Sequence, residues 1–205
     1  MKVALFSSVL IACLTLFSGH GIAADLARAV LDELNAARTA PCAYAAHLRT
    51  YRAHITGKYY IPPGSRVRYT LNEGAAAVDE AIRFLERQKP LPALGWSDGL
   101  AEAARELNRE QAKSGFIGHG SGGSALQPRL ERHGRWQRTI GENISYGPDE
   151  ARAVVMQLII DDGVPDRGRR NNIFAPDFGM AGIACGPHPV REASCVIEFA
   201  GVFSK

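Results

Sequence analysis

The sequence predicts an α+β fold in which most of the helices precede a small antiparallel sheet. Apolar residues recur at helical spacing in stretches that begin near residues 25, 73 and 97. The chain then ends in two strand-like runs, 179–185 and 194–203, separated by a Gly-Pro-His-Pro segment. A length of 205 residues, 46% of them hydrophobic and 22% charged, suits one globular domain. We therefore expect a single domain over residues 25–205.

The first half of the chain is predicted to be mostly helical. The first helix is expected from Asp25 onward, and Pro41 ends its pattern. A second short helix is expected to begin at Cys42 or Ala43. Residues 56–72 lack a helical period and contain glycines and prolines, so they are expected to form a loop.

Two further helices, a loop and a strand are expected in the middle of the chain. The next helix covers 73–88, and Ser97 is placed to cap the helix that follows it. A glycine-rich loop, 115–123, then surrounds His119. Residues 139–146 alternate like a strand, and another helix follows, with acidic residues at its start and a Gly-Val-Pro stop.

The N-terminal residues 1–24 have the three regions of a secretory signal peptide. Lys2 supplies the charge, 3–17 is the apolar run, and 19–24 contains small residues, with cleavage expected after Ala24. Export from the cytoplasm to a secreted or periplasmic location is therefore predicted.

The sequence disfavours two other interpretations of the N-terminus, a transmembrane anchor and a lipoprotein. A transmembrane anchor needs about 20 unbroken apolar residues, and polar residues interrupt this run, so no transmembrane anchor is expected. A lipoprotein would use Cys13 after Leu10-Ile11-Ala12, which would start the mature chain unusually early.

The charge balance argues against a polyanionic partner. Cleavage after Ala24 would remove Lys2 and lower the net charge of +3 by one, which is too small to favour nucleic acid or an anionic membrane. The local basic cluster of Arg167, Arg169 and Arg170 is interpreted as a solvated turn.

Three cysteines would remain in the exported chain. Cys185 and Cys195 flank the Gly-Pro-His-Pro segment, so they are predicted to form a disulfide across a hairpin in an oxidising compartment. Cys42 is expected to stay out of this bond.

An ordered series of motifs spans nearly all of the chain after residue 34. The motifs are 35–38 with Pro41, 94–96, 100–101, Gly118-His119, Gly141-Glu142-Asn143-Ile144, 158–163, 167–171, 182–184 and 195–200. In this order and spacing they resemble the CAP superfamily, also called the SCP domain, of cysteine-rich secretory proteins, antigen 5 and pathogenesis-related proteins of group 1. The chain is similar to an exported bacterial-type member.

The resemblance implies a three-layer α-β-α sandwich with a central cleft that carries two histidines and two acids. Matched by position, His119 is the first histidine and Glu142 the first acid, while Asp161 or Asp162 is the second acid. The second histidine falls at Arg169, where this sequence departs from the family.

The residue pattern itself supports two acidic cleft candidates. Period two places Glu142 on the same face of its strand as two isoleucines, so a carboxylate interrupts an apolar side. Helical spacing returns Asp161 to the buried stripe of its helix and turns Asp162 away from it, which favours Asp161. Asn143, beside Glu142, completes the set of cleft candidates.

No cofactor or metal is expected. In family members with both histidines the pair can hold a divalent metal such as zinc, but arginine at position 169 removes one ligand and adds a positive charge. Arg169 is expected instead to pair with Glu142 or Asp161, or to be exposed in the basic turn.

Three functional hypotheses follow, and whether the protein is an enzyme stays open. The first is an exported binding module whose cleft or adjacent surface engages a small apolar molecule, a lipid or an extracellular partner. The second is a hydrolase that uses His119, Glu142 and Asp161 as general acid-base groups. The third is a stable surface protein with a residual cleft. A thiol hydrolase with Cys42, His119 and Asn143 in that order is the least favoured alternative.

Overall fold

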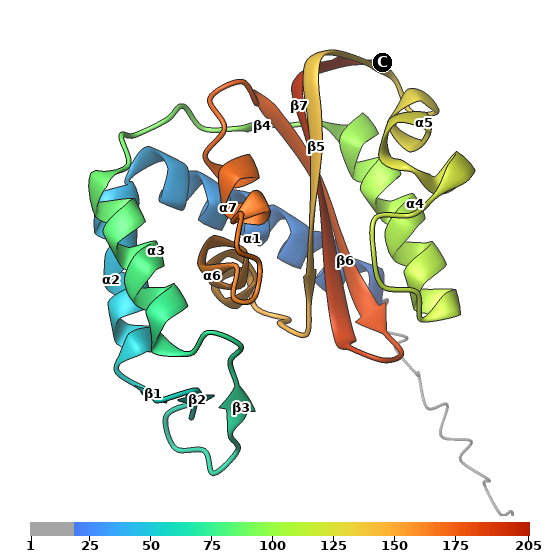
Figure 1. Ribbon diagram of the computed structural model, residues 1–205. Coiled ribbons are helices and arrows are strands. Elements are labelled where there is room, and N and C mark those ends of the chain that lie inside the picture. The colour runs from blue at the N-terminus through green and yellow to red at the C-terminus, as the bar shows by residue number, and fades with distance from the viewer. Residues whose placement is uncertain (1–18) are drawn as a thin grey trace, which may run out of the picture.

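A computed structural model describes residues 19–205 as a central sheet between two helical layers (Figure 1). The α+β class and the three-layer α-β-α sandwich are thus confirmed. The helices are α1 (Gly19–Thr39), α2 (Pro41–Arg52), α3 (Ala75–Arg87), α4 (Asp98–Ser114), η1 (Gly122–Ser124), α5 (Leu126–Glu131), α6 (Ala151–Ile160) and α7 (Gly168–Ile173).

The central sheet has the strand order β4-β6-β7-β5. Its strands are β4 (Gly95–Trp96), β5 (Arg135–Tyr146), β6 (Met180–His188) and β7 (Glu192–Ser204). Pairing is antiparallel except between β4 and β6, and β5 is an edge strand. Helices α1, α6 and α7 contact one face of the sheet, α4 and α5 contact the other, and α2 and α3 pack outside α1 and α6.

The segment expected to be a loop contains a second small sheet. Three two-residue strands, β1 (Ile55–Thr56), β2 (Tyr59–Tyr60) and β3 (Tyr69–Thr70), pair in antiparallel order. The expectation of a continuous loop over 56–72 was therefore wrong in part. Strands this short carry no period that a sequence pattern can reveal, because pairing of the backbone defines them.

The expected helix boundaries are otherwise close to those of the structure. The Ser97 hydroxyl accepts a hydrogen bond from the backbone N–H of Leu100 and so caps α4. Helix α4 ends at Gly115, whose φ of 71° is in the left-handed region that favours glycine. Residues 1–18 lie outside the described residues, so the signal peptide over 1–24 and its cleavage after Ala24 stay predictions. Among the residues that the structure describes, no helix is long and apolar enough to cross a membrane.

The two faces of the sheet bury different cores. On the α1 and α6 side, Cys195, Ile197 and Phe199 of β7 join the main hydrophobic core. On the α4 side, where Val196 and Ala200 point, the apolar residues form two separate clusters. The cluster near the start of α4 consists of Leu100, Ala103, Leu130, Ala200 and Phe203. The cluster farther along α4 consists of Ala104, Leu107, Ile144, Ala184 and Val196.

The predicted disulfide is present. Cys185 and Cys195 lie directly opposite each other in the β6–β7 hairpin and are bonded, with ten residues of separation. Cys42 is a free, exposed thiol near the start of α2. The bond closes the hairpin on the face that the main core covers.

Removing the disulfide should therefore lower stability. We expect the double variant Cys185→Ser with Cys195→Ser to lose about 2 to 3 kcal/mol of unfolding free energy in urea melts, because the closed loop no longer restricts the unfolded chain. The matched variant Cys42→Ser should unfold like the wild type. A loss of similar size in Cys42→Ser, or a Cys42 linkage found by non-reducing peptide mapping, would contradict this assignment.

Candidate functional site

The glycine-rich loop that carries His119 is held in place from both sides. The Gln111 side chain on α4 donates to the Gly118 carbonyl at 2.7 Å, and the Gly118 N–H donates to the Tyr146 hydroxyl at 2.9 Å. Gly120 has a φ of 76°, and an added Cβ would lie 2.3 Å from the Ser124 carbonyl oxygen, so glycine is required there. The loop therefore presents His119 in a defined position at the end of α4.

His119 and Glu142 form the first pair of the site. His119 Nδ1 lies 2.6 Å from Glu142 Oε1, and the imidazole is 62% exposed whereas the carboxylate is 2% exposed. Since an ionised carboxylate only accepts hydrogen bonds, this contact assigns a hydrogen to Nδ1 and leaves Nε2 toward solvent. The carboxylate lies on the α4 face of β5, as its period with Ile140 and Ile144 predicted.

Two further charged residues, Arg129 and Glu198, surround Glu142, and neither was predicted from the sequence as a site residue. Arg129 of α5 is fully buried and donates to Glu142 Oε2, to Glu198 Oε1 at 2.7 Å, and to the Ser124 carbonyl. Glu198 of β7 lies directly opposite Glu142 in the strand pairing and is also fully buried.

Only one of the two residues had a signal in the sequence. Glu198 is a charged residue inside the apolar run 195–200, which is the kind of interruption that singled out Glu142. Arg129 had no such signal, because the short helix α5 has no buried stripe from which a charge would stand out.

This cluster explains why the core on the α4 side is divided. Glu198 lies between Val196 and Ala200 on the same face of β7, so the charged groups separate the two apolar clusters. Burial raises the pKa of Glu198 well above its ordinary value, and repulsion by Glu142 raises it further, while Arg129 opposes both effects. The interior of this layer is therefore built around an ion pair.

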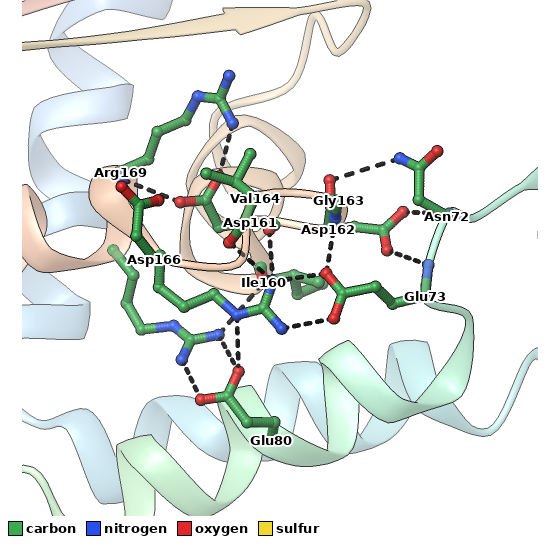
Figure 2. Close-up of polar contacts among 12 residues, drawn as sticks. Asn72, Glu73, Glu80, Ile160, Asp161, Asp162, Gly163, Val164, Asp166 and Arg169 are labelled. Carbon is green, nitrogen blue, oxygen red and sulfur yellow. Dashed lines mark hydrogen bonds and ion pairs between the residues drawn. The ribbon is translucent and has the colours of Figure 1, made fainter.

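The second pair of the site joins Asp161 and Arg169. Asp161 follows α6 with a φ of 52°, and its buried carboxylate accepts from the Arg169 guanidinium at 2.6 Å and from the Arg169 backbone N–H at 2.9 Å (Figure 2). Of the two expected partners of Arg169, the structure therefore brings Asp161 to it. Arg129 occupies the position beside Glu142 instead.

The other two arginines of this segment are not a solvated turn. Arg170 is 1% exposed and binds Glu80 of α3 with two nitrogens at 2.6 and 2.9 Å. Arg167 binds Glu73 with two nitrogens and also reaches Glu80. The interpretation of this cluster as solvated was wrong for both, because their acidic partners are Glu73, just before α3, and Glu80 of α3, about ninety residues away in the sequence.

Asp162 and Glu73 tie the same segment to the start of α3. The Asp162 carboxylate accepts from the backbone N–H groups of Asn72 and Glu73 at 2.7 and 2.8 Å, as Figure 2 shows. Hydrogen bonds from Arg167 lower the pKa of Glu73 to about 2. The stabilising contribution of Glu73 is thus fully present above its ordinary pKa of 4.5 and is lost as the pH falls toward 2.

Opposite faces of the edge strand β5 are directed to the two pairs. Glu142 points toward α4, whereas the next residue, Asn143, donates to the Arg169 carbonyl at 2.9 Å and accepts from Asn172 of α7 at 2.9 Å. Within residues 19–205, no hydrogen bond or ion pair connects His119–Glu142 with Asp161–Arg169. The expected cleft residues therefore lie in two groups, because neighbouring side chains on a strand alternate.

Tyr146, at the end of β5, is influenced by both groups. Burial raises the pKa of its hydroxyl, the Glu142 charge adds to this rise, and the Arg169 charge opposes it. The charge of Arg169 thus acts on Tyr146 at the end of β5, even though the ion-pair partner of Arg169 is Asp161.

The donor set does not fit a transition metal. His119 Nδ1 is engaged by Glu142, Arg169 stands where a second imidazole would be needed, and Asp161 belongs to the other group. Among the described residues, no three His, Cys, Asp or Glu side chains converge as a metal site requires. We assign no chemistry to a metal here.

Comparison with known proteins identifies the family. The model of the cysteine-rich secretory protein family, CAP, matches residues 31–199. The chain belongs to this family. No curated protein matches the CAP chain.

Three solved structures are similar to this CAP chain, all at low identity. An extracellular protein containing an SCP domain from Bacillus anthracis str. Ames is 19% identical, with a TM-score of 0.46 over 62% of this chain and 37% of that one. An outer surface protein from Borrelia burgdorferi is 18% identical, with a TM-score of 0.46 over 54% and 78%. A cysteine-rich secretory protein from Staphylococcus aureus subsp. aureus Mu50 is 16% identical, with a TM-score of 0.40 over 61% and 37%. The CAP chain thus spans little more than a third of two of these proteins.

Burial distinguishes two neighbouring arginines of α7. The Arg169 side chain is 38% exposed, so Arg169→Ala should cost about 1 to 2 kcal/mol of unfolding free energy, since Asp161 keeps its backbone hydrogen bond. Arg170→Ala should cost about 3 to 5 kcal/mol, because Arg170 is buried. Urea melts of both variants measure the difference, and equal losses would show that the burial of position 169 is misjudged.

Zinc should have little effect on thermal stability. A ligand that binds only the native state raises the melting temperature once its concentration exceeds its dissociation constant. We expect no saturable rise with micromolar zinc, because His119 meets only one carboxylate, Glu142, and no group of three ligands forms in the part of the chain that the structure describes. A saturable rise that disappears in His119→Ala would contradict this expectation, and His133→Ala is the control for surface histidines.

Proposed function

We propose that this CAP chain is an exported binding module that engages an apolar molecule, a lipid chain or the apolar face of an extracellular partner at the surface around His119. The observation that carries the proposal is a set of exposed apolar side chains beside this histidine. Phe116 is 43% exposed, Ile117 41% and Val190 66%. We call these three residues the apolar rim.

The apolar rim is assembled from two parts of the chain. The Phe116 ring lies against Gly118, where an added Cβ would be 3.0 Å from the ring, and the Phe116 carbonyl accepts from His188 Nε2 at 3.1 Å. Val190, at the turn of the β6–β7 hairpin, lies next to Gly115. Exposed apolar groups gathered in this way are typical of interaction sites.

His119 supplies a polar contact at the border of the apolar rim. Because Glu142 holds Nδ1, Nε2 can accept a hydrogen bond from a ligand hydroxyl or amide. A small number of polar groups among mainly apolar contacts is typical of small-molecule sites. Two surface hollows lie elsewhere, one by the disulfide and one along α4, and neither is lined by His119 or Glu142. The proposal therefore places the ligand on an open surface.

Export is part of this proposal. The N-terminal sequence has the regions of a signal peptide, and the disulfide Cys185–Cys195 suits an oxidising compartment. These two observations support a secreted or periplasmic location.

Hydrolysis with water as nucleophile is the alternative function. It is favoured by the orientation of the exposed His119 imidazole by Glu142, which Arg129 in turn holds, as in a general base with an orienting carboxylate. Asp161, expected to assist, belongs to the other group of residues. The thiol hydrolase hypothesis has no support, since His119 and Asn143 are bonded to other partners than Cys42.

A binding experiment tests the proposal. With a fluorescent long-chain fatty acid as probe, the double variant Phe116→Ser with Ile117→Ser should weaken binding at least tenfold, because the apolar contact is lost. The matched variant Val67→Ser with Tyr69→Ser, which changes exposed residues of the β1–β3 region, should bind like the wild type. Equal binding by all three proteins would overturn the proposal.

His119→Ala distinguishes the alternative. A binding module should retain most of its affinity for the probe and show no turnover of a panel of esters. Ester turnover by the wild type that His119→Ala abolishes, with probe affinity intact, would establish the hydrolase instead.

A further inference from the structure

Two buried glutamates face each other across β5 and β7, with a single cation between them. Glu142 and Glu198 are paired in register, their side chains are 2% and 0% exposed, and Arg129 is 0% exposed. A buried charge must be compensated by an opposite one. If both carboxyls were ionised and His119 were neutral, this cluster would carry one uncompensated negative charge.

The hydrogen bonds of the two carboxyls are unequal. Each oxygen of Glu142 has a donor, His119 Nδ1 at Oε1 and Arg129 at Oε2. Glu198 uses only Oε1, which accepts from two nitrogens of Arg129, and its buried Oε2 has no donor. Glu142 is within hydrogen-bond reach of Glu198, but two ionised carboxylates cannot donate to each other. An oxygen without a donor is the atom on which a hydrogen would be placed, because a bare carboxylate oxygen in the interior is costly.

The surroundings of Glu198 offer no second cation among the described residues. On β6 the position opposite is Gly182, where an added Cβ would collide with the backbone of α4, and α4 itself contributes apolar residues here. The other ionisable groups of this region are His119, which contacts Glu142, and Tyr146, at the end of β5. Burial and the charge of Glu142 together raise the pKa of Glu198, in agreement with this geometry.

We propose that Glu198 is a positioning residue that remains a neutral carboxylic acid at neutral pH and donates its hydrogen to Glu142, so that Glu142 is the anion that orients His119. One proton then serves two carboxyls, and the Arg129 charge is matched by one carboxylate. The two glutamates have the same side chain, but their different hydrogen-bond partners give them different protonation states. The proposal concerns the same site as the proposed function but does not depend on which ligand binds there.

Infrared spectroscopy of the full exported chain tests the protonation directly. In D2O at neutral pH the wild type should show the C=O band of a buried carboxylic acid. Glu198→Gln should lack the band, whereas Glu106→Gln, which changes a surface glutamate paired with His133, should retain it. A wild-type spectrum without the band overturns the proposal, and this measurement needs no variant to fold.

The pH dependence of stability gives a second, independent measurement. A carboxyl whose pKa is raised in the folded protein binds its proton more tightly in the native state. Stability therefore falls as the pH rises from 4.5, the ordinary pKa of glutamate, toward the pKa of Glu198 in the folded protein. Glu198→Gln removes this effect. The ratio of the unfolding constant of Glu198→Gln to that of the wild type should therefore fall as the pH rises, by up to about tenfold per pH unit within that window. A ratio of the two unfolding constants that stays the same across the window would contradict the proposal.

The tautomer of His119 identifies which glutamate is the anion. Imidazole 15N shifts should show the hydrogen on Nδ1 in the wild type and in Glu198→Gln, and loss of this preference in Glu142→Gln. The opposite pattern would place the anion at Glu198 and overturn the proposal. Loss of probe binding in the apolar rim variant, by contrast, concerns the proposed function alone, so the two can fail separately.

Discussion

The buried guanidinium of Arg129 is the interaction on which this side of the molecule depends. It joins α5 to β5 through Glu142, to β7 through Glu198, and to the end of the His119 loop through Ser124. An ion pair taken out of water is weak evidence for stability in itself, but removing one member leaves the others uncompensated. The cluster thus favours one arrangement of loop, helix and sheet, in which His119 meets Glu142.

A second ionic network has the same role on the other side of the sheet. Arg167 and Arg170 join the segment after α6 to Glu73, just before α3, and to Glu80 of α3, and Asp161 holds Arg169 at the start of α7. The edge strand β5 lies between the two networks, with Glu142 directed to one and Asn143 to the other. The polar residues that the family resemblance would gather in one cleft are here divided between two faces.

Much of the fold could be predicted because its causes are local. Ser97 caps α4 through an atom three residues away, and Cys185 and Cys195 meet because a short turn brings the hairpin strands together. The small β1–β3 sheet escaped prediction because its strands are defined by pairing rather than by a pattern. Glu142 was singled out by its apolar neighbours, and Glu198, in an equally apolar run, had the same signal.

The sequence by itself determined the α+β class, the CAP resemblance, the disulfide and the position of Glu142 on an apolar strand face, and it left Arg169 open between Glu142, Asp161 and exposure. Only the tertiary structure decided that Arg129 stands between Glu142 and Glu198, that Arg167 and Arg170 are paired with α3, and that Asp161 is apart from His119. The physical reason is distance along the chain. Periodicity reports which side of an element is buried, but a buried charge is stabilised by whichever opposite charge the fold brings to it. For Arg129, Arg167 and Arg170 these partners lie 13 to 94 residues away.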